Sequence, residues 1–200
     1  EVQKNFLSIC QASVERLILL INDILDFSKI EASRLQLNME PGVELVPLIT
    51  SVVGNLGGLA GKKKIELLTD LPETLPPLTI DPVRVAQVLT NLLFNAAHAI
   101  AEGRPDANHV TVTTTVRDGV AVTAVRDTGH GVSAEAQARL FEPFFTTKPR
   151  DRGTGLGLAI SADIARQHGG DLALASTSAG GSTFTLTLPL APAPDAAAGA

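Results

Sequence analysis

Three segments between residues 127 and 158 combine a carboxylate, glycines and phenylalanines in an order that suits nucleotide binding. The first reads DTGHG (127–131), the second FEPFFTTK (141–148) and the third GTGLGL (153–158). A carboxylate beside a glycine turn can accept a hydrogen bond from the amino group of a base. A glycine turn that opens a helix can hold phosphates on its free N–H groups. Together the segments predict an ATP site.

The first segment supplies the candidate for base recognition. Asp127 ends an expected strand, and Gly129 and Gly131 let the backbone approach a ring without interference from a Cβ atom. A hydrogen bond to a charged group contributes roughly 1.5–3 kcal/mol, which suits a specificity contact. Ordinary turns use the same residues, so this segment is a weak signal by itself.

The second segment concentrates three of the seven phenylalanines of the chain, at 141, 144 and 145. Two interpretations stay open and can hold together. The phenylalanines form a small satellite core beneath a loop, or they form a latch that anchors a mobile lid and brings Lys148 or Arg150 to the phosphates.

A fourth group of polar residues lies upstream, on an expected helix from residue 81 to about 101. Asp81-Pro82 marks its start, with a capping carboxylate followed by proline at the first helical position. Asn91, Asn95 and His98 recur every three or four residues and share one row. A carboxamide can bind Mg²⁺ through its oxygen or donate to phosphate through its nitrogen. Taken alone, the row is equally compatible with a solvated helix face.

The elements that position these residues follow from periodicity and turn signals. We expect helices at 1–40, 44–61, 81–101 and 156–168, with short strands at 64–70 and 78–81. Two hairpins, at 110–126 and 171–188, turn at Asp118-Gly119 and Gly180-Gly181. Hairpins with helices between them predict an α+β two-layer sandwich, in which helices cover one face of one sheet.

The first expected helix, ended by Pro41-Gly42, has apolar residues at two seven-residue phases that form a coiled-coil-like seam. Self-association or bundle packing is therefore expected; the alternative is a helix folded onto its own domain. The seam residues are Leu7, Val14 and Ile21 in one phase and Cys10, Leu17 and Ile24 in the other.

Composition narrows the class of protein. The chain has 200 residues, 44% hydrophobic and 18% charged, with a net charge of −5, which argues against nucleic acid as a partner. One cysteine and the lack of any apolar run of about 20 residues indicate a reducing, cytoplasmic setting. The chain begins with Glu1 and its only methionine is Met39, so we expect a fragment of a longer protein, which could be membrane-anchored. The Ala/Pro-rich tail, 189–200, is expected to be disordered.

These motifs, taken in order, resemble the N, first-glycine, F and second-glycine boxes of sensor histidine kinases, over about residues 80–188. Upstream, LINDILDFSKIEA (20–32) looks like the end of the second helix of their dimerisation and histidine-phosphotransfer domain. The resemblance implies the Bergerat ATP-binding fold of the GHKL superfamily for residues 41–188, with residues 1–40 as a remnant of that helix.

The resemblance also implies a role for each candidate residue. Asn95 would ligate Mg²⁺, and Asn91 would help to hold phosphate and metal. His98 would lie on the phosphate side, Asp127 would accept from the adenine amino group, and Lys148 would act from the lid. The remaining expected nucleotide contacts are Gly129, Gly131, Phe144, Thr147, Gly153, Thr154, Gly155, Leu156, Gly157 and Leu158.

One departure from the family pattern concerns the phosphate acceptor. The acceptor histidine of these kinases is followed by Glu or Asp, whereas the four histidines here are followed by Ala99, Val110, Gly131 and Gly169. The implied reaction is therefore transfer of the ATP γ-phosphoryl to a histidine on a helix absent from this chain, with a response regulator as the next acceptor.

Two other functions stay open. A GHKL-type ATPase would use hydrolysis to drive conformational change, and rapid hydrolysis without a histidine acceptor would favour it. A binding module would pair through the N-terminal helix and hold nucleotide only structurally. Loss of self-association without loss of ATP affinity, when that helix is removed, would separate pairing from nucleotide binding.

Overall fold

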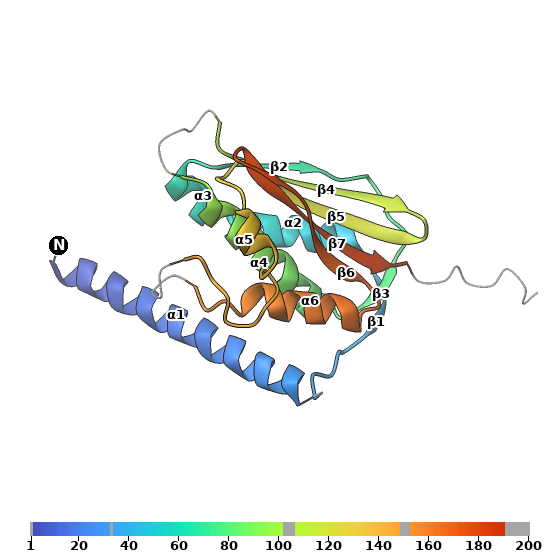
Figure 1. The fold of residues 1–200 in the computed structure, drawn as a ribbon, viewed down its shortest axis with the longest axis horizontal. Coiled ribbons are helices and arrows are strands. Elements are labelled where there is room, and N and C mark those ends of the chain that lie inside the picture. Colours follow the sequence, from blue (N-terminus) through green and yellow to red (C-terminus); the bar gives the residue numbers. More distant parts are fainter. Residues whose placement is uncertain (1, 33, 102–106, 149–152, 191–200) are drawn as a thin grey trace, which may run out of the picture. The chain divides into compact units, whose positions relative to one another are not determined.

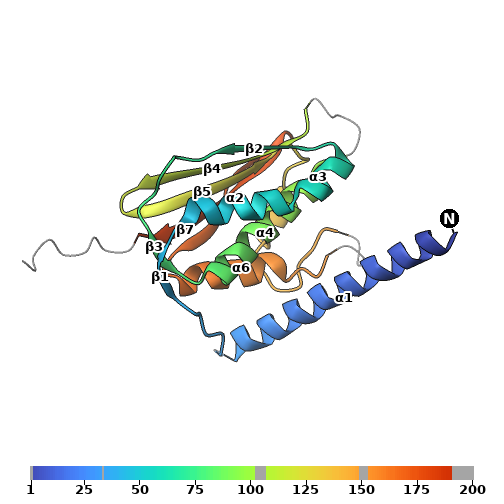
Figure 2. The same cartoon turned by 180° about the vertical axis from the view of Figure 1, so that it is seen from behind.

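The computed structural model describes residues 2–32, 34–101, 107–148 and 153–190. The chain divides into two compact units. The first comprises Glu1–Gln36 and Arg139–Ile160, and the second comprises Leu37–Ala138 and Ser161–Ala200. Figures 1 and 2 show the ribbon from opposite sides. The domain boundaries at residues 40 and 188 expected from the sequence stay a prediction.

A five-stranded sheet in the order β2-β4-β5-β7-β6 is the centre of the second unit. β2 pairs with β4 in parallel, and all other pairs are antiparallel. Asp118 and Gly119 have φ angles of 51° and 78°, and the type I′ hairpin turn requires positive values at both positions. The strands are β2 (Glu66–Asp70), β4 (His109–Arg117), β5 (Val120–Asp127), β6 (Asp171–Ser178) and β7 (Gly181–Pro189).

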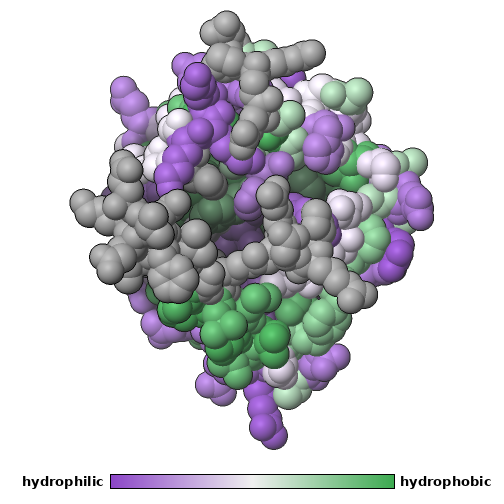
Figure 3. All heavy atoms as spheres, turned by 90° about the vertical axis from the view of Figure 1, so that its left-hand side faces the viewer, coloured by the Kyte–Doolittle hydropathy of each residue, from purple (hydrophilic) through white to green (hydrophobic). Residues whose placement is uncertain are grey.

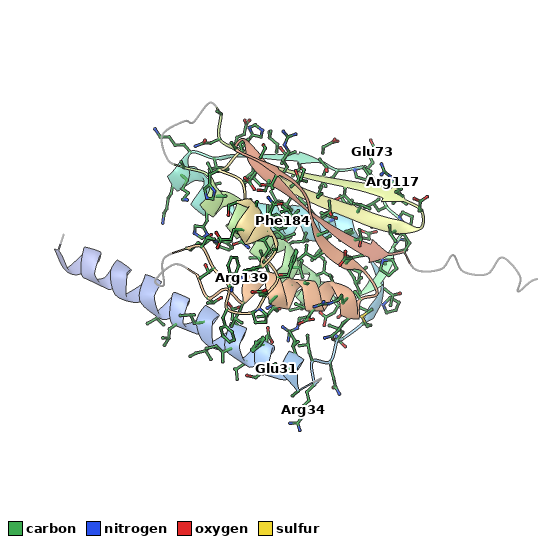
Figure 4. The ribbon with its side chains drawn as sticks, in the orientation of Figure 1. Glu31, Arg34, Glu73, Arg117, Arg139 and Phe184 are labelled. Atoms are coloured by element: carbon green, nitrogen blue, oxygen red, sulfur yellow. The ribbon has the colours of Figure 1, made fainter. Side chains whose placement is uncertain are left out.

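Helices cover one face of this sheet, as the predicted α+β sandwich requires (Figures 1 and 2). The alternation in β7 shows why: Phe184, Leu186 and Leu188 are buried, while the threonines between them are half-buried on the other face. Figure 4 labels Phe184 on this strand. The helices are α2 (Leu45–Asn55), α3 (Gly57–Lys63), α4 (Pro82–Ala99), the short α5 (Ala134–Gln137) and α6 (Gly157–Gln167).

Helix α4 begins at Asp81-Pro82, as the sequence predicts. Asp81 Oδ1 accepts hydrogen bonds from the N–H groups of Val83 (3.1 Å) and Arg84 (3.0 Å), with Pro82 at the first helical position. The helix ends at Ala99, close to the predicted end at 101.

The prediction of one helix over residues 1–40 is wrong at its end. α1 (Val2–Glu31) stops earlier, and Pro41-Gly42 lie in strand β1 (Glu40–Val43). β1 pairs antiparallel with β3 (Leu78–Ile80), and the Asn38 N–H donates to Asp81 Oδ2 at 2.8 Å. These long-range bonds hold the backbone extended where local periodicity favoured helix.

The expected helix at 44–61 is divided in two and ends two residues later. Leu56 separates α2 from α3, and Lys64 ends α3 in the left-handed region with φ 54°. The glycines at 54, 57 and 58 lower helix propensity at this point, which explains the break. At the other end of the chain, Pro189 still belongs to β7, and the rest of the predicted tail from residue 191 lies outside the described residues.

The first unit contains α1 and the segment Arg139–Ile160. Figure 3 shows hydrophobic surface gathered in the lower part of its view. Among the described residues no helix is long and apolar enough to cross a membrane. The apolar side chains of α1 with exposures between 48% and 57% are Val14, Leu17, Ile18, Ile21, Ile24 and Leu25.

Candidate functional site

Asp127, the candidate base-recognition residue, lies at the end of β5 and is only 3% exposed. Its Oδ1 accepts hydrogen bonds from the N–H groups of Gly129 (2.8 Å) and Ser182 (3.3 Å), and neither bond uses Oδ2. Burial raises the pKa of this carboxyl above its ordinary value, and the bonds from Gly129 and Ser182 offset only part of that rise. The result is a buried acceptor whose orientation is fixed through one oxygen.

The two glycines after Asp127 are required by the packing of the protein itself. A Cβ atom on Gly129 would lie 2.5 Å from the Ala99 carbonyl oxygen, at the end of α4. A Cβ on Gly131, which has φ +73°, would lie 1.9 Å from the Ser178 carbonyl oxygen. The sequence predicted that these glycines allow close approach by a nucleotide ring, whereas both Cβ positions point at backbone of this chain.

The same packing joins the first glycine turn to α4. The His130 N–H donates to the Ala99 carbonyl at 3.1 Å, beside the Gly129 approach. The helix that carries the asparagine row therefore ends against the turn that carries Asp127. The two candidate groups of this unit, distant in sequence, are held together by backbone contacts.

We expect Gly129→Ala to destabilise the protein by about 1–3 kcal/mol, because the new methyl group meets backbone that cannot move aside cheaply. Gly180→Ala is the matched control, since a Cβ there has only the Ser178 hydroxyl nearby, at 3.7 Å. Urea unfolding of both variants measures the difference. Equal stability of the two variants would contradict the packing account.

The predicted row on α4 is present, and its members differ in environment. Asn91 and Asn95 are half-buried, and His98 is exposed. Asn91 Nδ2 donates to Ser161 Oγ on α6 at 3.2 Å. The His98 ring stacks on Phe94 with 6.3 Å between ring centroids. The interpretation of this row as a solvated face therefore fits His98 and does not fit the two asparagines.

In the first unit, two phenylalanines of the second segment contact residues outside that segment: Phe144 contacts Phe27 of α1, and Phe145 contacts Arg139. None of the three is buried, so the satellite-core interpretation is wrong. Phe144 is 62% exposed and meets Phe27 of α1 edge to face, with 5.2 Å between centroids. The Arg139 guanidinium lies 4.4 Å from the Phe145 ring centroid, and Figure 4 labels Arg139. The lid interpretation stays a prediction.

Residues on either side of the expected lid lie close together in this unit. The Lys148 N–H donates to Thr146 Oγ1 at 3.1 Å, and a Cβ on Gly153 would lie 2.8 Å from the same oxygen. Gly155 has φ +70°, and its Cβ position is 2.5 Å from the Phe144 carbonyl carbon. Thr147 is exposed and Lys148 is half-buried. The second glycine segment is thus packed directly against the phenylalanine segment.

Thr154 bonds to α1 through its side chain. Its hydroxyl donates to Asp23 Oδ2 and accepts from the Leu156 N–H, both at 3.1 Å. Burial raises the pKa of the Asp23 carboxyl; the Thr154 bond lowers it, and the nearby Asp26 charge raises it further. Beyond Thr154, Leu156 is buried, Gly157 begins α6, and Leu158 is half-buried.

Several residues that shape the second unit's site were missed by the sequence analysis. Ser182 acts through its backbone N–H, which side-chain identity does not reveal. Ser161 lies on α6, accepts from Asn91 of α4 and is fully buried; its burial is the only signal that a helical wheel of α6 could have given. Thr177 Oγ1 accepts from the Val132 N–H at 2.8 Å and holds the end of the Asp127 turn.

The α+β fold is a five-stranded sheet covered by helices on one face, with a buried carboxylate at a strand end beside a glycine turn, an arrangement that suits nucleotide binding. Residues 80–192 match the family described as histidine kinase-, DNA gyrase B-, and HSP90-like ATPase. The chain belongs to this family, and the match extends over all four predicted motifs.

The individual relatives are named as sensor proteins or sensor histidine kinases. The chain is 36% identical over 191 residues to the sensor protein TorS of Escherichia coli, covering 94% of this chain and 20% of TorS. It is 38% identical over 183 residues to the sensor histidine kinase MtrB of Mycobacterium bovis, covering 90% and 31%. The chain thus spans between a fifth and a third of these two relatives.

Solved structures agree with the sequence relatives. Full-length ShkA, crystallised in complex with AMPPNP, matches with a TM-score of 0.81 at 30% identity, over 96% of this chain and 40% of ShkA. The histidine kinase AdeS of Acinetobacter baumannii matches with a TM-score of 0.72 at 26% identity, over 90% of this chain and 81% of AdeS. These matches confirm the predicted fold class and the resemblance to sensor histidine kinases.

Proposed function

We propose that this chain transfers the γ-phosphoryl group of ATP to a histidine carried by a polypeptide segment outside it, as the catalytic part of a sensor histidine kinase. The observation that supports this most directly is the buried Asp127 carboxylate, held through Oδ1 by Gly129 and Ser182. An acceptor oriented in this way suits the amino group of adenine. Four motifs in the family order support the remaining assignments.

The residues of α4 fit a magnesium–phosphate site by their donor chemistry. Asn95 offers a carboxamide oxygen, a ligand type suited to a hard cation, and Asn91 offers an N–H₂ donor and an oxygen from the same helix. Bound Mg²⁺ would neutralise phosphate charge. On the proposed assignment, Asn95 ligates the metal while Asn91 orients the phosphates, and Lys148 adds positive charge from the lid.

The second glycine segment is proposed to bind phosphate oxygens through backbone N–H groups. Gly155 has φ +70° and Gly157 begins α6, so this segment turns into a helix N-terminus, where the positive end of the helix dipole attracts anions. Phosphoryl transfer needs positioning and charge stabilisation more than covalent chemistry from the enzyme. The catalytic share of this chain is therefore to bind and orient ATP.

We place the histidine that accepts the phosphoryl group on another polypeptide segment, because none of the four histidines of this chain suits that role. None is followed by an acidic residue that could serve as general base. His168 is 5% exposed and is hydrogen-bonded on both ring nitrogens. The acceptor is then a histidine-phosphotransfer helix, and a response regulator aspartate is the proposed next acceptor.

Labelling with γ-³²P-ATP and Mg²⁺ tests this proposal. We expect tight nucleotide binding and no label on the chain itself. An acid-labile, base-stable label would mean that one of the four histidines is an acceptor, which contradicts the external-acceptor assignment. Rapid ATP hydrolysis without an added histidine helix would instead favour the alternative of an ATPase that drives conformational change.

Self-association through α1 is the other part of the proposal, because several of its described apolar side chains are exposed. We expect Leu17→Glu, at a residue that is 57% exposed, to abolish the dimer in analytical ultracentrifugation while ATP affinity is kept. Asn22→Glu, on the same helix but at an exposed polar position, is the control. A wild-type chain that stays monomeric at high concentration would contradict pairing through this helix.

A further inference from the structure

His168 occupies a buried position between the end of α6 and the start of α4, within the second unit. Its ring is 5% exposed, with Nε2 2.9 Å from the Asp81 nitrogen and Nδ1 2.8 Å from the Ile164 carbonyl oxygen. Because a backbone N–H can only donate, Nε2 is the acceptor. The ring proton therefore lies on Nδ1 and is donated to Ile164, so both ring nitrogens are engaged.

The partner of His168 organises the beginning of α4. Asp81 is 5% exposed, and its carboxylate accepts from the N–H groups of Val83, Arg84 and Asn38. Its carbonyl accepts from Val85, the first intrahelical bond. The Asp81 N–H is the remaining polar group of this residue, and His168 accepts from it. Removing that acceptor would leave a buried N–H without a partner, which is costly.

A second hydrogen bond joins the same two helices further along. Asn91 Nδ2 donates to Ser161 Oγ at 3.2 Å, and Ser161 is fully buried. At 1.5 Å per residue, Asn91 lies about 15 Å beyond Asp81 on α4. Two connections separated in this way restrain both the sliding and the rotation of α4 against α6.

We infer that His168 is a positioning residue for nucleotide binding: by accepting from the Asp81 N–H it fixes the register of α4 and, through it, the place of Asn91 and Asn95. The inference rests on the proposed roles of these two asparagines. On this inference, His168 acts only by accepting a hydrogen bond at Nε2 and does not itself contact the nucleotide.

Two substitutions distinguish the hydrogen bond made by Nδ1 from the one made by Nε2. In His168→Asn the amide nitrogen can replace Nδ1 and donate to Ile164, but no atom reaches the Asp81 N–H. In His168→Gln the longer side chain places an oxygen acceptor where Nε2 lies. We expect Mg–AMPPNP affinity, measured by calorimetry at a temperature where each variant is folded, to fall about tenfold in His168→Asn and to be restored within about threefold in His168→Gln.

Thr114→Val controls for general destabilisation. It removes the buried hydroxyl pair of Thr114 and Thr123, at 3.2 Å within the β4–β5 hairpin. We expect a lower melting temperature with unchanged affinity. Equal affinity of His168→Asn and wild type would overturn the inference, and so would a His168→Gln variant as weak as His168→Asn.

Amide hydrogen exchange keeps the test independent of nucleotide. We expect the N–H groups of Asp81, Val83 and Arg84 to exchange faster in His168→Asn than in His168→Gln. If the wild type itself fails to bind Mg–AMPPNP, the proposed function fails, and exchange alone then decides whether His168 fixes the start of α4. Equal exchange in the two variants would refute that part.

Discussion

Asn95→Ala is expected to abolish Mg²⁺-dependent nucleotide binding, the largest effect of any single substitution proposed for this protein. The change removes the carboxamide oxygen assigned to the metal while keeping a good helix former on α4. Loss of a residue that merely supports a metal ligand costs roughly 10- to 100-fold in metal affinity. Loss of the ligand itself should therefore cost at least about 100-fold.

Calorimetry with AMPPNP, in Mg²⁺ and in EDTA, measures this effect. The wild type should bind more tightly in Mg²⁺, and Asn95→Ala should bind equally weakly in both buffers. Asn95→Asp keeps an oxygen ligand and should retain part of the Mg²⁺ dependence. Asn55→Ala, at an exposed asparagine that ends α2, is the control for a general effect of losing an amide. Unchanged affinity in Asn95→Ala would remove this residue from the site.

Asp127→Asn is expected to weaken ATP binding by about 10- to 150-fold, the equivalent of a hydrogen bond to a charged group at roughly 1.5–3 kcal/mol. The asparagine has one oxygen, which the N–H groups of Gly129 and Ser182 already require. Its NH₂ group then faces the amino group of adenine, donor against donor. Guanine presents an oxygen at that position, so the preference for ATP over GTP should shrink.

Competition binding with ATP and GTP checks the specificity. The same ATP-to-GTP ratio in wild type and Asp127→Asn would show that the carboxylate does not read the base. Thr128 offers a control beside the site, since its hydroxyl bonds to His109 of β4 rather than facing a ligand. Thr128→Ser keeps that hydroxyl and should keep the ratio.

Asp127→Asn, which should weaken ATP binding, should increase the stability of the fold at higher pH. Because burial raises the pKa of Asp127 in the folded state, the fold favours the protonated carboxyl. Its contribution is full below the ordinary pKa of an aspartate and is lost as pH rises through the raised value. Asparagine is neutral throughout, so Asp127→Asn should gain stability over wild type as pH rises. Urea unfolding across this pH range measures the difference, and a constant difference would contradict the sign.

Local chemistry explains the elements that were predicted correctly. The Asp81 cap is made by bonds to Val83 and Arg84, two and three residues away. The Asp118-Gly119 turn needs only two positive φ angles, and the alternation in β7 needs only one buried and one half-buried face. Each signal spans a few residues, so the sequence alone contains it.

The predicted site contains residues that could be recognised from the sequence and others that could not. The types and order of Asn91, Asn95 and Asp127 were readable, because the chemistry of their side chains suggests their ligands. Two supporting residues were not readable: the Ser182 N–H that binds Asp127 carries no side-chain signature, and His168 has the pattern of an ordinary helix-end residue until its bond to Asp81 is seen. In each of these two bonds the residues are more than fifty positions apart in the chain.

The sequence by itself therefore determined the family motifs, the helix starts and hairpin turns, and the candidate nucleotide ligands. Only the tertiary structure decided where α1 ends, why Gly129 lacks a side chain, and what holds α4 in register. The reason is physical. Backbone propensity and side-chain chemistry act within a few residues, whereas the β1–β3 pairing, the approach of Gly129 to Ala99 and the His168–Asp81 bond depend on which distant segments the packed core brings together.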